Sequence, residues 1–298
     1  MSAVRARHDP PFIPRQITNG ALAAANIVYC CPENHKIGMN SFAQDALLRL
    51  FLALAASIMV NATGSTQGRG AMTKWEYYLV AANYIATLRD YGFTIEPVTR
   101  FEDVPDLAAR TGRTFQMPAF SIPRADLSEN SAFWLFLKLE GEYIGGAAAM
   151  LQNIGSERLD SYLNRTMNHH FPHESGKTIA DMAGPLSEYS GKLAYIGELH
   201  FHKSYRGKRE VLKSFMRLFH VMTLLEWNQD WIYAFIPERH MMVRLDLVYG
   251  FARTLEKAQI WSQPGPDLRA SSEWFVAASR SELDHMLRRD LQAEMSSE

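Results

Sequence analysis

The stretch from Leu193 to Trp227 constrains the fold more than any other part of this chain. It opens with an apolar, alternating run as far as His202, which predicts a strand. A basic turn follows at residues 203–209, and apolar residues then recur at spacings of three and four, which predicts a helix with one buried face. The residues of that face are Val211, Phe215, Leu218, Met222 and Leu225. A strand, a turn and a helix in this order present unpaired backbone N–H groups to an anion at the helix N-terminus.

Composition argues against several classes of protein. The chain has 298 residues and a formal net charge of −1, so it can bury a substantial core and gives no general electrostatic case for nucleic acid. Its two cysteines, Cys30 and Cys31, are adjacent and imply no disulfide framework, which favours a cytoplasmic location. The longest apolar run, from Leu50 to Val60, is well short of the roughly 20 residues that span a bilayer, so stable membrane insertion is not expected.

Changes in composition predict three parts: an N-terminal extension at 1–71 with one helix from about Asn40 to Val60, a main domain at 72–280, and a charged C-terminal helix and tail at 281–298. In the main domain, two apolar runs about the turn at 140–142 predict a hairpin. Further strands are predicted at 93–98, 194–202, 231–236, 253–261 and 273–278, and helices at 72–91, 103–110 and 237–249, with another after residue 154. Together these elements predict a mixed α/β (α+β) fold, in which helices flank a mixed central sheet.

From Phe93 onward the predicted order is strand, helix, three strands, helix, strand, helix and two strands. This order resembles the GNAT-type superfamily of acyl-CoA N-acyltransferases. In that family the strand before the long helix runs into an Arg/Gln-x-x-Gly-x-Gly/Ala turn, whose backbone N–H groups hold the pyrophosphate of acyl-CoA. Here Arg206 fits the first position, but Arg209 and Val211 replace the two small residues. The segment from 247 to 251 is similar to the Gly-Phe end of the family's penultimate helix.

The departures from the family's turn have physical consequences. Arg209 and Val211 add bulk where glycine lets the backbone approach a phosphate, and Glu210 adds a negative charge. Arg206 and Lys208, together with Arg209, can compensate as side-chain ligands for phosphate. The turn therefore either still binds acyl-CoA or is degenerate. The residues expected to bind acyl-CoA are Phe201, His202, Arg206, Gly207, Lys208 and Arg209.

The resemblance also implies a general acid. Many members of the family place a tyrosine four residues before the glycine of the penultimate helix, where its hydroxyl protonates the leaving thiolate. Asp246 occupies that place in this chain, and Tyr249 directly precedes Gly250. Tyr249 is therefore either a displaced acid or a packing residue of the core.

Residues two apart on a strand share a face, so we expect Ile196, Glu198, His200 and His202 on one side of the strand at 194–202. Three ionisable groups on one face of a buried strand are costly unless they meet water, a partner or a ligand. An amine must be neutral to attack a thioester, and Glu198 or His200 can take its proton. A structural role is the alternative, with Glu198 paired to an arginine or lysine.

A second alternative is a metal site. In it, Glu198, His200 and His202 bind zinc or iron together with one histidine of the segment at 169–173. The histidines of that segment are His169, His170 and His173. The pattern His-x-His on a strand is common by chance, so we expect no metal.

We therefore hypothesise an enzyme that transfers an acyl group from CoA to a small-molecule or peptide amine, with Glu198, His200 and Tyr249 as its catalytic residues. The acyl group is acetyl or longer, since Gly145 and the small residues that follow it leave room. A homodimer is compatible with the aromatic-rich helix at 72–91. The rival hypotheses are a non-catalytic binding or regulatory module of the same fold and a His/Glu metal-dependent enzyme. Arg239, which can bind an anion, is expected to be solvated.

Overall fold

The computed structural model describes residues 71–98, 100–121, 124–125 and 127–296. The predictions for residues 1–70, including the helix ending at Val60, lie outside these residues. The described strands are β1 (Phe93–Pro97), β2 (Ala132–Leu139), β3 (Glu142–Gly155), β4 (Ile179–Met182), β5 (Gly191–Phe201), β6 (Trp231–Ile236), β7 (Arg253–Leu255), β8 (Gln259–Trp261) and β9 (Trp274–Ser279).

The described α-helices are α3 (Lys74–Asp90), α4 (Val104–Arg110), α5 (Leu159–His170), α6 (Arg209–Trp227), α7 (Glu238–Met242), α8 (Leu245–Tyr249) and α9 (Arg280–Met295). None of these helices combines the length and the apolar character needed to cross a bilayer. Most of them lie where the sequence predicts a helix, and in α6 the predicted apolar stripe is buried.

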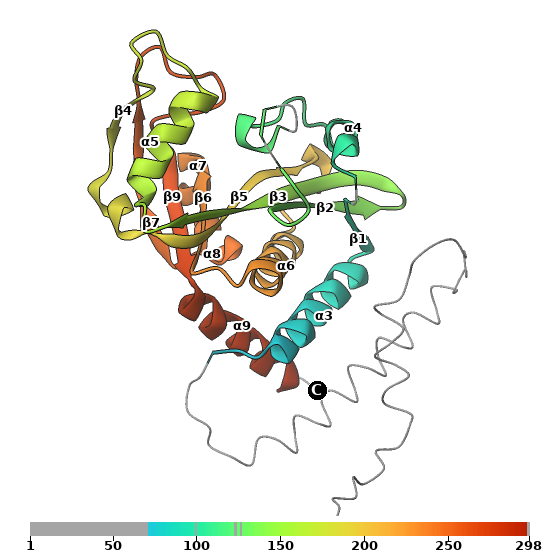
Figure 1. Ribbon diagram of the computed structural model, residues 1–298. Helices are drawn as coiled ribbons and strands as arrows, with labels where there is room; N and C mark the ends of the chain where they lie inside the picture. Colours follow the sequence, from blue (N-terminus) through green and yellow to red (C-terminus); the bar gives the residue numbers. More distant parts are fainter. Residues whose placement is uncertain (1–70, 99, 122–123, 126, 297–298) are drawn as a thin grey trace, which may run out of the picture. The chain divides into compact units, whose positions relative to one another are not determined.

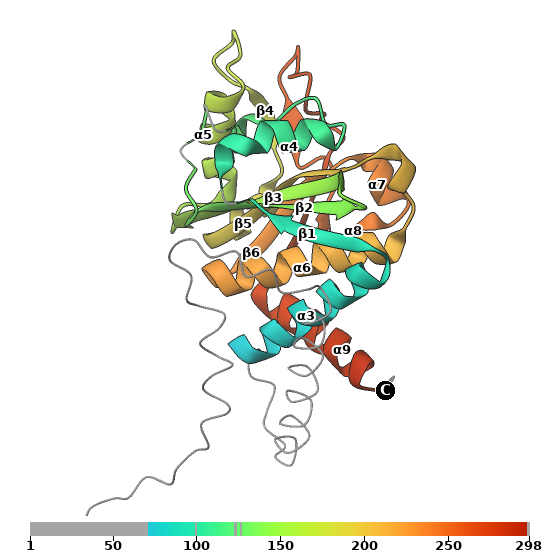
Figure 2. The same ribbon diagram turned by 90° about the vertical axis from the view of Figure 1, so that its right-hand side faces the viewer.

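The strands form a seven-stranded sheet in the order β1-β2-β3-β5-β6-β9-β7 and, elsewhere in the described chain, a two-stranded sheet of β4 and β8 (Figure 1). In the large sheet β5 and β6 run parallel, and the other neighbouring strands run antiparallel. Helices α3, α6 and α9 cover one face, while α4, α5 and the small sheet cover the other (Figure 2). The predicted mixed α/β class is therefore confirmed.

Each face of the large sheet has its own hydrophobic core. On the α6 face, Val211, Phe215 and Leu218 are each at most 2% exposed, as the spacing of the apolar residues predicts. On the opposite face, Trp134 and Trp261 are equally buried between the sheet, α4, α5 and the small sheet. Burial of one large apolar side chain contributes about 1.5–3 kcal/mol, so packing on both faces holds the sheet in place.

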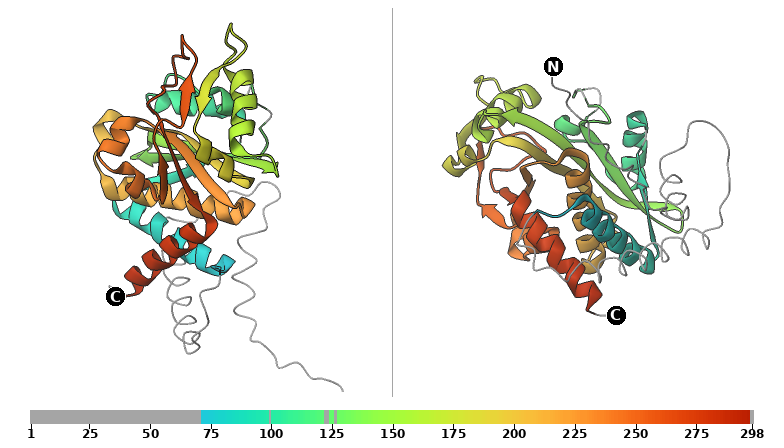
Figure 3. Two further views of the ribbon diagram at one scale, coloured as in Figure 1. Left: turned by 90° about the vertical axis from the view of Figure 1, so that its left-hand side faces the viewer. Right: turned by 60° about the horizontal axis from the view of Figure 1, so that its bottom comes forward.

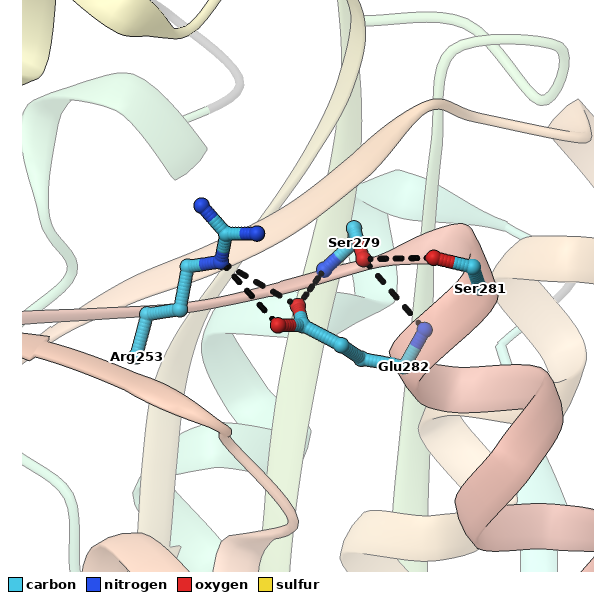
Figure 4. Close-up of polar contacts among 4 residues, drawn as sticks. All are labelled: Arg253, Ser279, Ser281 and Glu282. Carbon is cyan, nitrogen blue, oxygen red and sulfur yellow. Dashed lines mark hydrogen bonds and ion pairs between the residues drawn. The ribbon is translucent and has the colours of Figure 1, made fainter.

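Polar contacts fix the start of the C-terminal helix α9. Ser279 is its N-cap: the hydroxyl accepts a hydrogen bond from the backbone N–H of Glu282, whose carboxylate accepts one from the N–H of Ser279 (Figure 4). Arg253 of β7 donates to the same carboxylate over 3.1 Å. Farther along, Asp284 accepts a hydrogen bond from the hydroxyl of Tyr77, and α9 lies beside α3 (Figure 3).

Two sequence predictions are corrected by the structure, and one strand is added. The helix predicted at 237–249 is two short helices: α7 ends at Met242, and Arg244, with a left-handed φ of 55°, precedes α8. The strand predicted at 253–261 is divided between two sheets, since β7 pairs with β9 and β8 with β4. Strand β4 is the addition, because it lies in a segment for which only a helix and a long excursion were predicted.

The small residues of β3 are packed closely by neighbouring parts of the chain. A Cβ added to Gly146 would lie within 2.6 Å of the ring of Phe136, and one added to Gly145 within 2.8 Å of the backbone oxygen of His200. These glycines therefore permit close packing inside the sheet. The room for a longer acyl group that was expected there is filled by the protein itself.

Candidate active site

Strands β5 and β6 separate partway along their length. Their parallel pairing covers three positions, from Leu193–Trp231 to Tyr195–Tyr233, although β5 continues to Phe201 and β6 to Ile236. Backbone N–H and C=O groups beyond the last pair are freed from the ladder and are available to a ligand. The opening between the two strands is the structural basis of the site.

Two cavities adjoin this opening. The first, here called the inter-strand cavity, has a volume of about 200 Å³ and lies between β5 and β6. The second, the turn cavity, has a volume of about 350 Å³ and lies against the turn that joins β5 to α6. Both cavities are lined by Leu199, Arg239, His240 and Tyr249, so these side chains lie where the two spaces meet.

A β-bulge in β5 places Glu198 on the face of the strand that is directed toward α4. Gly197 pairs with Ala148 and His200 with Gly146, so two residues of β5 oppose the single residue Ala147. Glu198 has a φ of 61°, a left-handed conformation that costs a residue with a side chain about 1–2 kcal/mol.

The bulge corrects the predicted face of the strand. Ile196 packs in the core on the α6 side, and Leu199 and Phe201 pack against the same core. Glu198 and His200 instead face α4, where both contact residues of the opposite core. Ile196 therefore does not share a face with the two ionisable residues, because the extra residue at the bulge shifts the alternation by one.

Glu198 is buried, with an exposed fraction of 8%. Its Oε1 accepts hydrogen bonds from Arg113 Nη2 at 2.9 Å and from the backbone N–H of Met117 at 2.8 Å. Burial raises the pKa of Glu198, and the charge of Arg113 offsets part of that rise. The result is a carboxyl group whose affinity for a proton is higher than usual, held at the wall of the inter-strand cavity.

The two histidines of β5 have different environments. His200 lines the turn cavity, and burial together with the charges of Arg113 and Arg206 lowers its pKa. His202 lies outside both cavities: its Nδ1 accepts a hydrogen bond from the backbone N–H of Ser204 and caps the short 3₁₀ turn that follows. The structure thus brings His200, but not the side chain of His202, to the site.

The basic turn lines the turn cavity with Arg206, Gly207, Lys208 and Arg209. Gly207 has a φ of 93°, which glycine adopts without strain. The side chain of Arg206 donates to the carbonyl of Phe201. The first turn of α6 starts beside these residues. The N-cap residue of the helix, Lys208, makes no side-chain hydrogen bond to the first backbone N–H groups.

The residues that depart from the family's turn do not close the cavity. Val211 is 1% exposed and packs in the core with α6. The Arg209 guanidinium extends toward the backbone oxygen of Val243 at 3.5 Å. Glu210 lies 3.6 Å from Lys213 and lines a different cavity, between α3, α6 and α9. Its negative charge is therefore directed away from the turn.

Tyr249 lies where the two cavities meet and is 2% exposed. Its hydroxyl is 3.1 Å from His240 Nδ1, and its backbone oxygen accepts a hydrogen bond from His220 Nε2 at 2.6 Å. Burial raises the pKa of Tyr249 and lowers that of His240, so the phenol keeps its proton and the imidazole is neutral. Burial also lowers the pKa of His220 to about 3, which leaves it a neutral donor.

Sequence analysis missed Arg113, His220 and His240, and assigned Arg239 to solvent. Arg239 is exposed, yet it lines both cavities. No local motif marks these residues, because Arg113 meets Glu198, and His220 meets Tyr249, from a distant segment of the chain.

The histidines proposed for a metal site are not assembled in the described part of the chain. His173 is hydrogen-bonded to Ser175 and to the backbone oxygen of Gln263, at the end of the molecule that holds β4 and β8. His169 and His170 lie next to each other at the end of α5. Among residues 71–98, 100–121, 124–125 and 127–296, no three His, Cys, Asp or Glu side chains are grouped as ligands for a metal ion.

No protein-family model and no curated protein matches the sequence. Solved structures are similar to it. One is the aminoglycoside acetyltransferase AAC(6')-Ib with coenzyme A and kanamycin (14% identity; 65% of this chain and 98% of that chain covered; TM-score 0.38). Another is FeeM, an N-acyl amino acid synthase from uncultured soil microbes (11%; 64% and 92%; 0.37). A third is a polyamine N-acetyltransferase of Drosophila melanogaster (9%; 63% and 99%; 0.38).

These are N-acyltransferases, and the similarity lies in the fold. Residues 93–279 form a mixed α/β fold with a central, mostly antiparallel sheet flanked by helices.

Proposed function

We propose that this protein is an acyl-CoA-dependent N-acyltransferase. One observation carries the proposal: Glu198 and the Tyr249–His240 pair line a single cavity, at the point where β5 and β6 separate. That cavity meets a second one lined by the basic turn. A proton acceptor, a proton donor and an anion site thus follow one another along one opening.

The residues present fit CoA. The turn cavity offers the side chains of Arg206, Lys208 and Arg209 and the free N–H groups at the start of α6 to a diphosphate. The unpaired edges of β5 and β6 offer hydrogen bonds to the amides of a pantetheine arm. When bound, acyl-CoA supplies a thioester, which an amine attacks.

The protein's own groups have distinct roles in this reaction. Glu198 accepts the proton that the ammonium group must lose before its nitrogen can attack. Its raised pKa makes it a stronger base than an exposed glutamate. A carbon–nitrogen bond forms, the carbon–sulfur bond breaks, and Tyr249 donates its proton to the sulfur; the second proton, which the nitrogen loses on becoming an amide, restores the Tyr249 hydroxyl. His240 orients the Tyr249 hydroxyl and is itself kept neutral by burial.

A non-catalytic binding module is the second candidate, because the ion pair of Glu198 with Arg113 would also suit a purely structural carboxylate. Two measurements separate the candidates. Calorimetric titration with acetyl-CoA tests binding, and release of free thiol in the presence of a panel of amines tests transfer. Binding together with thiol release supports the enzyme, and binding without thiol release supports the module. If the titration gives no heat of binding up to millimolar acetyl-CoA, both the enzyme and the binding module are contradicted. A homodimer and a cytoplasmic location stay predictions.

A further inference from the structure

The charged side chains along the inter-strand cavity are mostly paired with one another. They are Arg113, Glu198, Arg239, Arg269 and Glu273. Arg113 Nη2 lies 2.9 Å from the Glu198 carboxylate, and Arg269 Nε lies 2.7 Å from that of Glu273. In these pairs three of the four side chains are less than 10% exposed, and Glu273 is 16% exposed. Each carboxylate on this wall therefore already has an arginine.

Arg239 differs from the other four. It makes no hydrogen bond or ion pair within the described ranges of the chain, and it lines both cavities where they meet. Its charge acts against the burial-driven rise in the pKa of Tyr249 and contributes to the low pKa of His240. The guanidinium is therefore close enough to act on the groups assigned to proton transfer.

The charge balance of this wall disfavours one class of amine. The described residues contribute three positive and two negative charges, so the wall carries one excess positive charge. A polyamine would need free carboxylates, and the two carboxylates present are each held by an arginine. The phosphates of CoA have their own cations, Arg206, Lys208 and Arg209, on the turn.

We propose, on the basis of the proposed function, that the amine substrate carries a carboxylate and that Arg239 binds this carboxylate. The substrate class is then amino acids or closely similar zwitterions. Arg239 would hold the carboxylate by two parallel hydrogen bonds, as arginine does with planar anions. The contacts of Glu198 with Arg113 and Met117 both use Oε1, so Oε2 would take the proton from the ammonium group of the same molecule.

Matched pairs of amines test this assignment. The pairs are phenylalanine with phenethylamine and ornithine with 1,4-diaminobutane, each assayed with acetyl-CoA and with a medium-chain acyl-CoA. We expect kcat/KM to be about tenfold or more higher for the member with the carboxylate, the size expected of one charge-assisted contact. Arg239→Gln should bring each pair close to parity, mainly through KM of the amine, and Arg239→Lys should restore part of the preference.

Lys203 provides the matched control, because it is an exposed cation of the turn between β5 and α6 and lines neither cavity. Lys203→Gln should leave the preference unchanged. Equal or better transfer to the amines without a carboxylate would overturn this assignment while the proposed function stands. An Arg239→Gln variant that raises KM for acyl-CoA and keeps the amine preference would also overturn it. Binding of acetyl-CoA without transfer to any amine would overturn the proposed function and this inference together.

Discussion

The turn cavity and the inter-strand cavity use charge in opposite ways. On the turn, Arg206, Lys208 and Arg209 are exposed and contact no carboxylate within the described part of the chain. Between the strands, Glu198 is buried and its partner Arg113 is supplied by a distant segment. The first region exposes its cations to solvent, and the second holds an ion pair out of solvent. In the proposed function, flexible cations on the turn substitute for the backbone donors that glycine would present.

The largest effect is expected from Glu198→Gln in the inter-strand cavity. Glutamine can keep the contacts of Oε1 but cannot take a proton, so kcat/KM for acyl transfer should fall by about 10²–10⁴. Glu273→Gln is the matched control, since it removes the carboxylate from the other buried pair of the same cavity. Both variants should lose stability in chemical denaturation. An equal loss of activity in both would show that Glu198 acts only through the structure.

The pH dependence should follow the raised pKa of Glu198. Activity requires the unprotonated carboxylate, so kcat/KM should fall as pH drops through a pKa above the ordinary 4.5. The unfolded chain releases this proton first as pH rises, so the free energy of unfolding should decrease with pH between the two pKa values. Rate and denaturation profiles of Glu198→Gln should lack both changes. If His200→Gln instead removes the acidic limb of the rate profile, His200 is the base.

The next largest effect is expected from Tyr249→Phe, where the two cavities meet. The ring keeps its packing and the hydroxyl is lost, so kcat should fall by about a hundredfold. Affinity for acetyl-CoA, measured by calorimetry, should change little. Tyr233→Phe is the control: its buried hydroxyl is bonded to Gln152 and lies outside both cavities. A Tyr249→Phe enzyme with normal kcat would assign Tyr249 to packing alone.

The smallest effect is expected on the turn. Lys208→Ala should weaken acetyl-CoA binding about tenfold, and the loss should shrink at high salt because the charge is exposed. Glu210→Gln should change the affinity less than about twofold, since its carboxylate lies beside Lys213 and faces another cavity. Titrations at low and high salt measure both. A large gain in affinity from Glu210→Gln would place its charge at the anion site after all.

Much of the fold was predictable because local patterns determine it. The apolar spacing of α6 and the hairpin of β2 and β3 follow from periodicity and a turn. The break at Arg244 was not predictable, because a residue with a side chain adopts the left-handed conformation there and no glycine or proline marks the position. The division of residues 253–261 between two sheets likewise depends on the partners β9 and β4, which no local pattern names.

The site was predictable only where one segment supplies it. Glu198 and the basic turn stand out in the sequence, and the structure places both at cavities. Arg113 and His240 reach the site from elsewhere in the chain, so neither has a local signal. The alternation rule also placed Ile196 wrongly on the same face as Glu198. The cause is the extra residue at the bulge in β5, which no feature of the sequence marks.

The bulge in β5 adds one inward-facing residue without moving the side chains that follow it. Deleting that position would restore regular pairing with β3 and leave Leu199 and His200 on their present faces. Such a shortened strand would keep its packing on both sides and lose only the carboxylate at the bend. The fold thus reserves a place for one inward-facing group and leaves its chemistry open, so relatives could exchange the glutamate for another functional side chain without rebuilding the sheet.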